Sequence, residues 1–66
     1  MLVEQEILNN SLKDLLFREE LLAKKYSELK NDITEPQLQQ MIQTMEQSSR
    51  NRYKLITEKM NTLGIS

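Results

Sequence analysis

A line of apolar side chains at helical spacing runs through the first half of the chain and limits what it can fold into. Residues taken alternately four and three positions apart are apolar or aromatic from Leu8 to Ile33, with Glu19 as the one exception. This spacing places them on one face of a single amphipathic helix. The predicted face consists of Leu8, Leu12, Leu15, Glu19, Leu22, Tyr26, Leu29 and Ile33. The first half of the chain therefore predicts a long helix with one polar residue near the middle of its apolar face.

The second half of the chain has a similar line, and one turn separates the two. Its members are Leu38, Ile42, Met45, Ser49, Tyr53, Ile56, Met60 and Leu63. Pro36 suits the first position of a helix and disfavours a helical residue before it, which predicts a break at residues 32–35. Ser11 with Asp14 resembles a capping box that would start the first helix late, whereas Leu8 is already in phase with the line. We favour the earlier start, with helices at about 4–31 and 36–63 in one domain of residues 1–66.

Two helices joined by a short turn predict an all-α fold, an antiparallel helical hairpin. A chain of 66 residues has a small core, and it contains no cysteine or histidine for disulfides or a zinc site. Because a hairpin buries only the seam between its helices, we expect a homodimer that completes a ferritin-like four-helix bundle. The predicted core and interface residues are Leu8, Leu12, Leu15, Leu22, Tyr26, Leu29, Leu38, Ile42, Met45, Tyr53, Ile56 and Met60.

Composition excludes several classes of function. Nine Lys and Arg against ten Asp and Glu argue against a nucleic-acid binder. No apolar run approaches the roughly 20 residues of a membrane span, and the start of the chain lacks the pattern of a signal peptide, so we expect a cytoplasmic protein that does not bind a membrane. Without histidine or cysteine there is no nucleophile pair, and no glycine-rich loop is present to hold phosphate. We therefore expect no catalytic residues, no cofactor and no enzymatic activity.

Phe17 and Leu21 lie four residues apart on the side of the first helix away from its apolar face. One interpretation is a local surface pair without further role. The other is a contact site for a second protein, since apolar side chains that cluster on a surface mark interaction sites. That interpretation predicts a small regulatory or adaptor module.

A polar layer is predicted half-way along the hairpin, where Glu19 and Ser49 interrupt the two apolar lines at about the same level. Glu46 is close by. In one interpretation Glu46 pairs with Arg50 while Glu19 is met by Arg52, Ser49 or a tyrosine hydroxyl, and the layer only sets the register of the helices. In the other, a dimer supplies the candidate ligands Glu19 and Glu46 twice, and four carboxylates bind a hard cation such as Mn²⁺, Mg²⁺ or Ca²⁺. We favour the first interpretation, with no metal.

The chain resembles the spore coat F-like proteins of the ferritin-like superfamily over roughly residues 11–64. The matching positions run from Lys13-Asp14-Leu15-Leu16 through Glu19, Tyr26, Thr34-Glu35-Pro36-Gln37-Leu38, Glu46 and Met60 to Gly64. Di-iron members of that superfamily bind metal through a first-helix glutamate and a Glu-x-x-His on the second helix. Those positions correspond to Glu19, Glu46 and Ser49 here, with serine in place of histidine. The resemblance thus implies a non-enzymatic structural or assembly protein associated with the spore coat, ahead of an adaptor or a degenerate metal-binding bundle.

Overall fold

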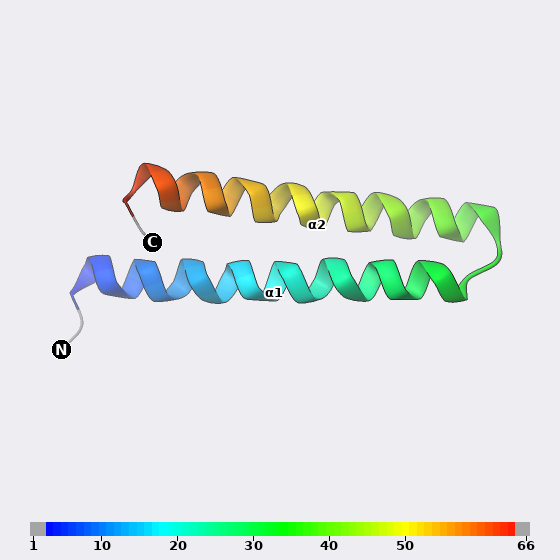
Figure 1. Ribbon diagram of the computed structural model, residues 1–66, viewed down its shortest axis with the longest axis horizontal. Helices are drawn as coiled ribbons and strands as arrows, with labels where there is room; N and C mark the ends of the chain where they lie inside the picture. Colours follow the sequence, from blue (N-terminus) through cyan, green and yellow to red (C-terminus); the bar gives the residue numbers. More distant parts are fainter. Residues whose placement is uncertain (1–2, 65–66) are drawn as a thin grey trace.

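The chain folds into two long helices that lie side by side in opposite directions. The computed structural model describes residues 3–64, with α1 at Glu4–Asp32 and α2 at Pro36–Thr62 (Figure 1). The molecule measures 50 × 21 × 13 Å. An all-α antiparallel hairpin was predicted, and this is confirmed. The helices begin and end within one residue of the ranges expected from the sequence.

The first helix begins before the polar residues that could have delayed it. Val3 is extended, and its carbonyl accepts a hydrogen bond from the backbone N–H of Ile7 at 3.1 Å. Glu4 and Glu6 in the first turn lie near the exposed backbone N–H groups, where negative charge is favourable. The alternative start at Ser11 is therefore not adopted.

Residues 33–35 make the turn, in which Ile33 and Glu35 are extended, and Pro36 then starts α2 with its φ already helical. The side-chain amide of Gln39 donates to the carbonyl of Ile33, which ties the turn to the first turn of α2. At the other end Gly64 has a φ of +72°, a conformation that glycine adopts without strain. The turn is thus short enough to keep both helices in contact along most of their length.

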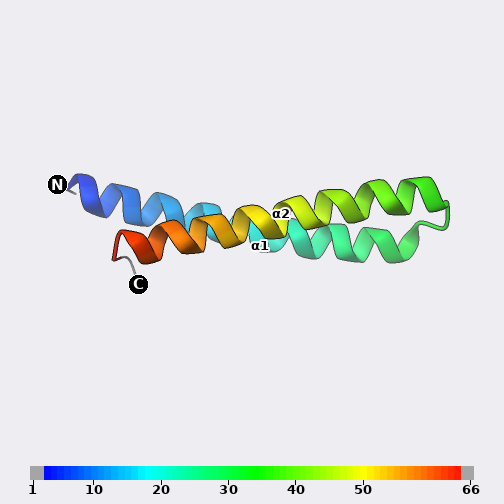
Figure 2. The ribbon, with the colours of Figure 1, turned by 90° about the horizontal axis from the view of Figure 1, so that it is seen from above.

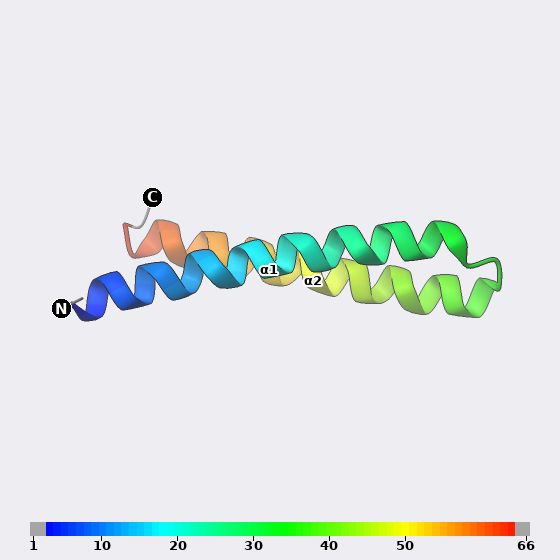
Figure 3. The same cartoon turned by 90° about the horizontal axis from the view of Figure 1, so that it is seen from below.

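The helix axes cross at a shallow angle. Figure 2 shows α1 and α2 exchanging sides near their midpoints, and Figure 3 shows the same crossing from below. A slight inclination is the usual geometry of helices in bundles, because it lets side chains of one helix fit between those of the other along their length. The crossing falls in the central part of the hairpin.

The seam between the helices is displaced from the one expected. Its buried and half-buried members on α1 are Asn9, Leu12, Leu16, Glu19, Ala23, Tyr26 and Lys30. On α2 they are Gln39, Ile42, Glu46, Ser49, Ile56 and Met60. Leu15 and Leu29, which were predicted as core or interface residues, do not lie in this seam, because Leu16 and Lys30 take that side. Each helix is turned so that a small side chain, Ala23 on α1 and Ser49 on α2, faces the other helix. In this arrangement the charged groups of the two helices also reach one another.

This rotation divides the predicted core and interface residues into two groups. Those that are buried or half-buried within one hairpin are Leu12, Leu22, Tyr26, Ile42, Ile56 and Met60. Those that are exposed are Leu8, Leu15, Leu29, Leu38, Met45 and Tyr53. In the described residues the buried apolar core consists only of Ala23, Ile42 and Met60. A single hairpin therefore leaves much of the apolar surface in water.

Candidate functional site

Glu19 of α1 joins α2 through both of its carboxylate oxygens. Ser49 is fully buried, and its hydroxyl lies 2.7 Å from Oε2 of Glu19 and 3.0 Å from the main-chain oxygen of the same residue. The Nε of Arg52 donates to Oε1 of Glu19 at 2.7 Å. Arg52 and Ser49 were two of the three partners proposed for Glu19 from the sequence, and both are present. The contacts fix the level of α1 against α2 at the centre of the hairpin.

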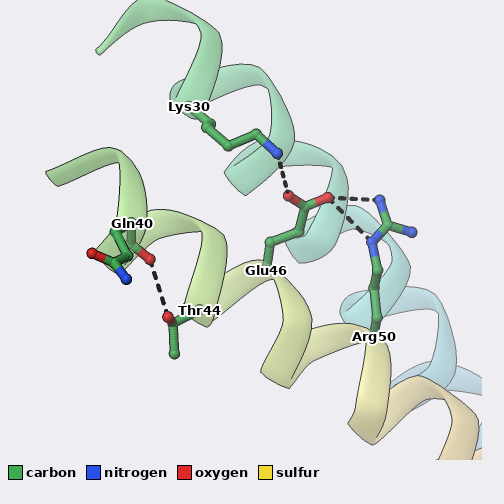
Figure 4. Close-up of polar contacts among 5 residues, drawn as sticks. All are labelled: Lys30, Gln40, Thr44, Glu46 and Arg50. Carbon is green, nitrogen blue, oxygen red and sulfur yellow. Dashed lines mark hydrogen bonds and ion pairs between the residues drawn. The ribbon is translucent and has the colours of Figure 1, made fainter. Parts of the chain in front are cut away.

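Glu46 makes the second link between the helices. Here the carboxylate is on α2 and the cation is on α1, the reverse of the pair between Glu19 and Arg52. Its Oε1 accepts from Nζ of Lys30 on α1 at 3.2 Å, and its Oε2 accepts from Nη2 of Arg50 at 2.8 Å (Figure 4). The pairing with Arg50 along the same helix was expected from the sequence. The pairing with Lys30 was not, because Lys30 lies 16 residues from Glu46 and meets it only through the hairpin.

Figure 4 also shows a purely local contact for comparison. The hydroxyl of Thr44 donates to the carbonyl of Gln40 in the preceding turn of α2 at 3.0 Å. Such a bond satisfies a side chain within its own helix and fixes nothing between helices. Glu46, two residues after Thr44, is the residue whose charged side chain bonds to α1.

The cations around the two carboxylates keep them ionised. The hydrogen bond from Arg52, and then that from Ser49, lowers the pKa of Glu19 below its ordinary value. The hydrogen bonds from Arg50 and then Lys30 likewise lower the pKa of Glu46. Glu19 in turn raises the pKa of Arg52. Each buried or half-buried carboxylate therefore carries its charge at neutral pH beside at least one cation, as a charge in such a place requires.

The bonding leaves little room for a cation between Glu19 and Glu46 in one hairpin. All four carboxylate oxygens already accept a hydrogen bond from a serine, lysine or arginine. Within residues 3–64 there is also no group of three or more potential ligands close enough together to hold a metal ion. A site with four carboxylates would need a second copy of the chain and the release of these partners.

Four exposed leucines lie with the half-buried Leu22 and the exposed Met45 on one side of the hairpin, here termed the leucine face. Leu15, Leu22 and Leu29 of α1 each come one residue before a seam residue, as do Leu38 and Met45 of α2. The helices run antiparallel and face each other with equivalent positions, so residues directly before the seam lie on the same side of both. The leucine face consists of Leu8, Leu15, Leu22, Leu29, Leu38 and Met45.

A shallow groove lies on another side of the hairpin and contains the pair singled out in the sequence. Phe17 and Leu21 are 59% and 45% exposed, and they line the groove with Ala23, Arg50 and Tyr53. Phe17 and Leu21 thus line the same groove, which is separate from the leucine face. The remaining lining residues are Glu19, Glu20, Lys24 and Ser27.

Comparison with known proteins adds no family. No family model matches the chain, and neither a curated protein nor a solved structure is significantly similar to it. Within the part that the structure describes, neither helix contains a stretch long and apolar enough to cross a membrane. The class defined by the fold is an all-α helical hairpin with a polar central layer and an exposed leucine face.

Proposed function

We propose that this chain is a non-enzymatic structural or assembly protein that acts as a homodimer, in which two hairpins form a four-helix bundle. The observation that carries the proposal is the imbalance between the three buried apolar residues found in residues 3–64 and a long row of exposed leucines. Contiguous apolar patches on small proteins mark interaction sites, and a helix face of this kind is covered by other helices in bundles.

The size of the exposed surface supports the same proposal. The accessible surface of the hairpin is 5356 Å². A compact protein of 7.8 kDa is expected to expose about 4,400 Å², so the hairpin exposes about 1,000 Å² more. A stable protein interface buries about 800 Å² on each partner. The excess surface is therefore large enough for one such interface.

Light scattering on a sizing column tests the homodimer directly. We expect a mass of twice 7.8 kDa for the wild-type chain. Leu15→Glu should give a monomer, because it places a charge in the middle of the leucine face. Phe17→Glu is the matched control on the groove side and should stay dimeric. A monomeric wild-type chain would overturn the proposal.

Divalent metal should not change that mass. The carboxylate oxygens of Glu19 and Glu46 are already bonded to protein donors, so assembly needs no cation in this proposal. The mass is compared in Mn²⁺ and in EDTA. A dimer that forms only in Mn²⁺ would instead favour the degenerate metal-binding bundle.

The groove around Phe17 and Leu21 supports a second candidate function, an adaptor that binds a larger protein. An amphipathic helix fits an apolar groove through a few anchor side chains. A partner that is captured by the wild-type chain and lost with Phe17→Asp, while the mass in solution stays unchanged, would support this function. Capture of the same proteins by both chains would count against it.

The spore coat is the setting that the resemblance to coat F-like proteins suggests for such an assembly. An antibody against the chain should then detect it in detergent-insoluble coat extracts of spores. Detection only in the soluble fraction of the mother cell would contradict this setting, and the homodimer would stand independently of it.

A further inference from the structure

We propose that the partner of the leucine face is a second copy of this chain, packed with its turn at the opposite end of the bundle. This inference rests on the proposed homodimer and adds the interface and the orientation of the two hairpins. Two hairpins packed face to face can place α1 against the partner's α1, with the turns at opposite ends. They can also place α1 against the partner's α2, with both turns at the same end.

The leucines of α1 are arranged symmetrically along the helix. Leu8 and Leu29 lie equally far from the midpoint between Leu15 and Leu22. When α1 packs antiparallel against a second α1, Leu8 meets Leu29 of the other copy and Leu15 meets Leu22. Such a contact is made of leucines along its whole length. It exists only when the two turns lie at opposite ends.

The corresponding line on α2 is not symmetrical. Leu38 and Met45 are followed at the same seven-residue spacing by Arg52 and Lys59, so at this spacing the line changes from apolar near the turn to basic near the C-terminus. The exposed Leu55, one residue before the seam residue Ile56, lies between the two basic residues. Arg52 is already paired with Glu19 and does not discriminate between the two arrangements. Lys59 does, because among residues 3–64 no ion pair across the seam holds it away from the interface.

Lys59 favours turns at opposite ends because of what would surround it. With both turns at one end, the two copies of Lys59 would lie in the same layer of the bundle, and like charges would meet where water is partly excluded. With the turns at opposite ends, each Lys59 lies at the level of the other hairpin's Leu29 and Leu38. One lysine per layer can lay its aliphatic stem over leucines and keep its ammonium group in water.

One electrostatic effect opposes this arrangement and is weaker. Arg18 lies near the midpoint of the leucine line, so the two copies of Arg18 would approach each other. Both side chains are largely exposed, and each is paired with Asp14 of its own helix at 3.0 Å. Repulsion between exposed, paired charges is small in salt solution compared with the burial of a continuous leucine contact.

Cross-linking between single-cysteine variants tests the orientation, because the natural chain contains no cysteine. Leu8→Cys and Leu29→Cys chains are mixed, with a tag on one of them, and treated with a short bis-maleimide. Leu29→Cys and Leu38→Cys chains are mixed in the same way. Each variant is first shown by light scattering to have the wild-type mass. Phe17→Cys, on the groove side, is the control that should not cross-link.

We expect the mixed product from Leu8→Cys with Leu29→Cys and none from Leu29→Cys with Leu38→Cys. The reverse pattern would show both turns at one end and overturn the orientation, while the homodimer itself would stand. A dimer that cross-links in neither mixture would overturn the leucine face as the interface. A monomeric wild-type chain would overturn the proposed function instead, so the failures are distinguishable.

Discussion

The central layer and the leucine face reverse the usual distribution of polar and apolar residues. Ser49 is 0% exposed and Glu46 8%, whereas Leu15 is 48% exposed. Within one hairpin, the polar residues occupy the positions between the helices, and the leucines lie beside them in water. In our proposal the difference teaches that the two regions have separate tasks. The polar layer sets the register of the helices within the chain, and the leucine face makes the contact with a second chain.

The polar layer suits the first of these tasks because its bonds are directional. Glu19 reaches from α1 to α2, and Glu46 is reached from α1 by Lys30, so a shift of either helix along the other would break both links. Paired charges add little net stability, since their desolvation offsets most of their attraction, but an unpaired alternative is costly. The layer therefore selects one alignment of the two helices. Apolar contacts alone would allow one helix to slide along the other.

The Ser49→Leu variant should break the polar layer and gives the largest expected effect. Leucine cannot fit the fully buried site without moving α1, and Glu19 loses one of its hydrogen bonds. We expect the free energy of unfolding to fall by about 3 kcal/mol, measured by chemical denaturation at one fixed chain concentration. The control is Ser48→Leu at the exposed neighbouring position. Equal stability of the two variants would show that the layer is not a packed contact.

The Arg52→Ala variant should sharpen the comparison by leaving Glu19 without its cation. Glu19 is largely buried by its neighbours, whereas Asp14 of the pair with Arg18 is exposed. We expect Arg52→Ala to lower the melting temperature by several degrees. Arg18→Ala is the matched control and should change it by less than about 2 °C. Similar shifts in both variants would place the Glu19 pair among ordinary surface ion pairs.

Acidification should weaken the polar layer before it affects the leucine face. The pKa values of Glu19 and Glu46 are lowered in the folded hairpin, so the unfolded chain binds protons first as the pH falls. Stability should be constant above about pH 5 and decrease below the ordinary glutamate pKa of 4.5. Thermal melts across this pH range measure the decrease in stability. In the control, the double variant Glu19→Gln/Glu46→Gln, the decrease should be smaller. A stability that rises on acidification would contradict these pairings.

Asn9 gives the smallest expected effect and tests whether polar seam residues are useful only when they are paired. Its side-chain oxygen is buried without a hydrogen-bond partner among the residues that the structure describes, unlike the groups of the central layer. We expect Asn9→Leu to raise the free energy of unfolding by about 1 kcal/mol, because it removes an unsatisfied polar group. Asn10→Leu at the exposed neighbouring position should leave it nearly unchanged. Destabilisation by Asn9→Leu would show that Asn9 has a partner in solution.

Much of the fold could be predicted because it depends on local signals. The apolar spacing from Leu8 to Ile33 indicates a helix wherever that helix packs, and Pro36 marks the start of the next one. The level of Glu19 and Ser49 followed from counting residues out from the turn. The pairing of Glu46 with Arg50 followed from their spacing of four residues. These features involve residues close in the sequence or equally distant from one turn.

The sequence by itself determined two helices, their lengths and the polar centre of each apolar line. Only the tertiary structure decided which side of each line faces the other helix, and so brought Leu16, Ala23 and Lys30 to the seam. The reason is that an apolar face spans more than 100° of a helix, wider than the contact with one neighbour. Within this wide face, each helix is turned so that Lys30 meets Glu46, a contact between residues far apart in the sequence. The same rotation leaves the leucines exposed.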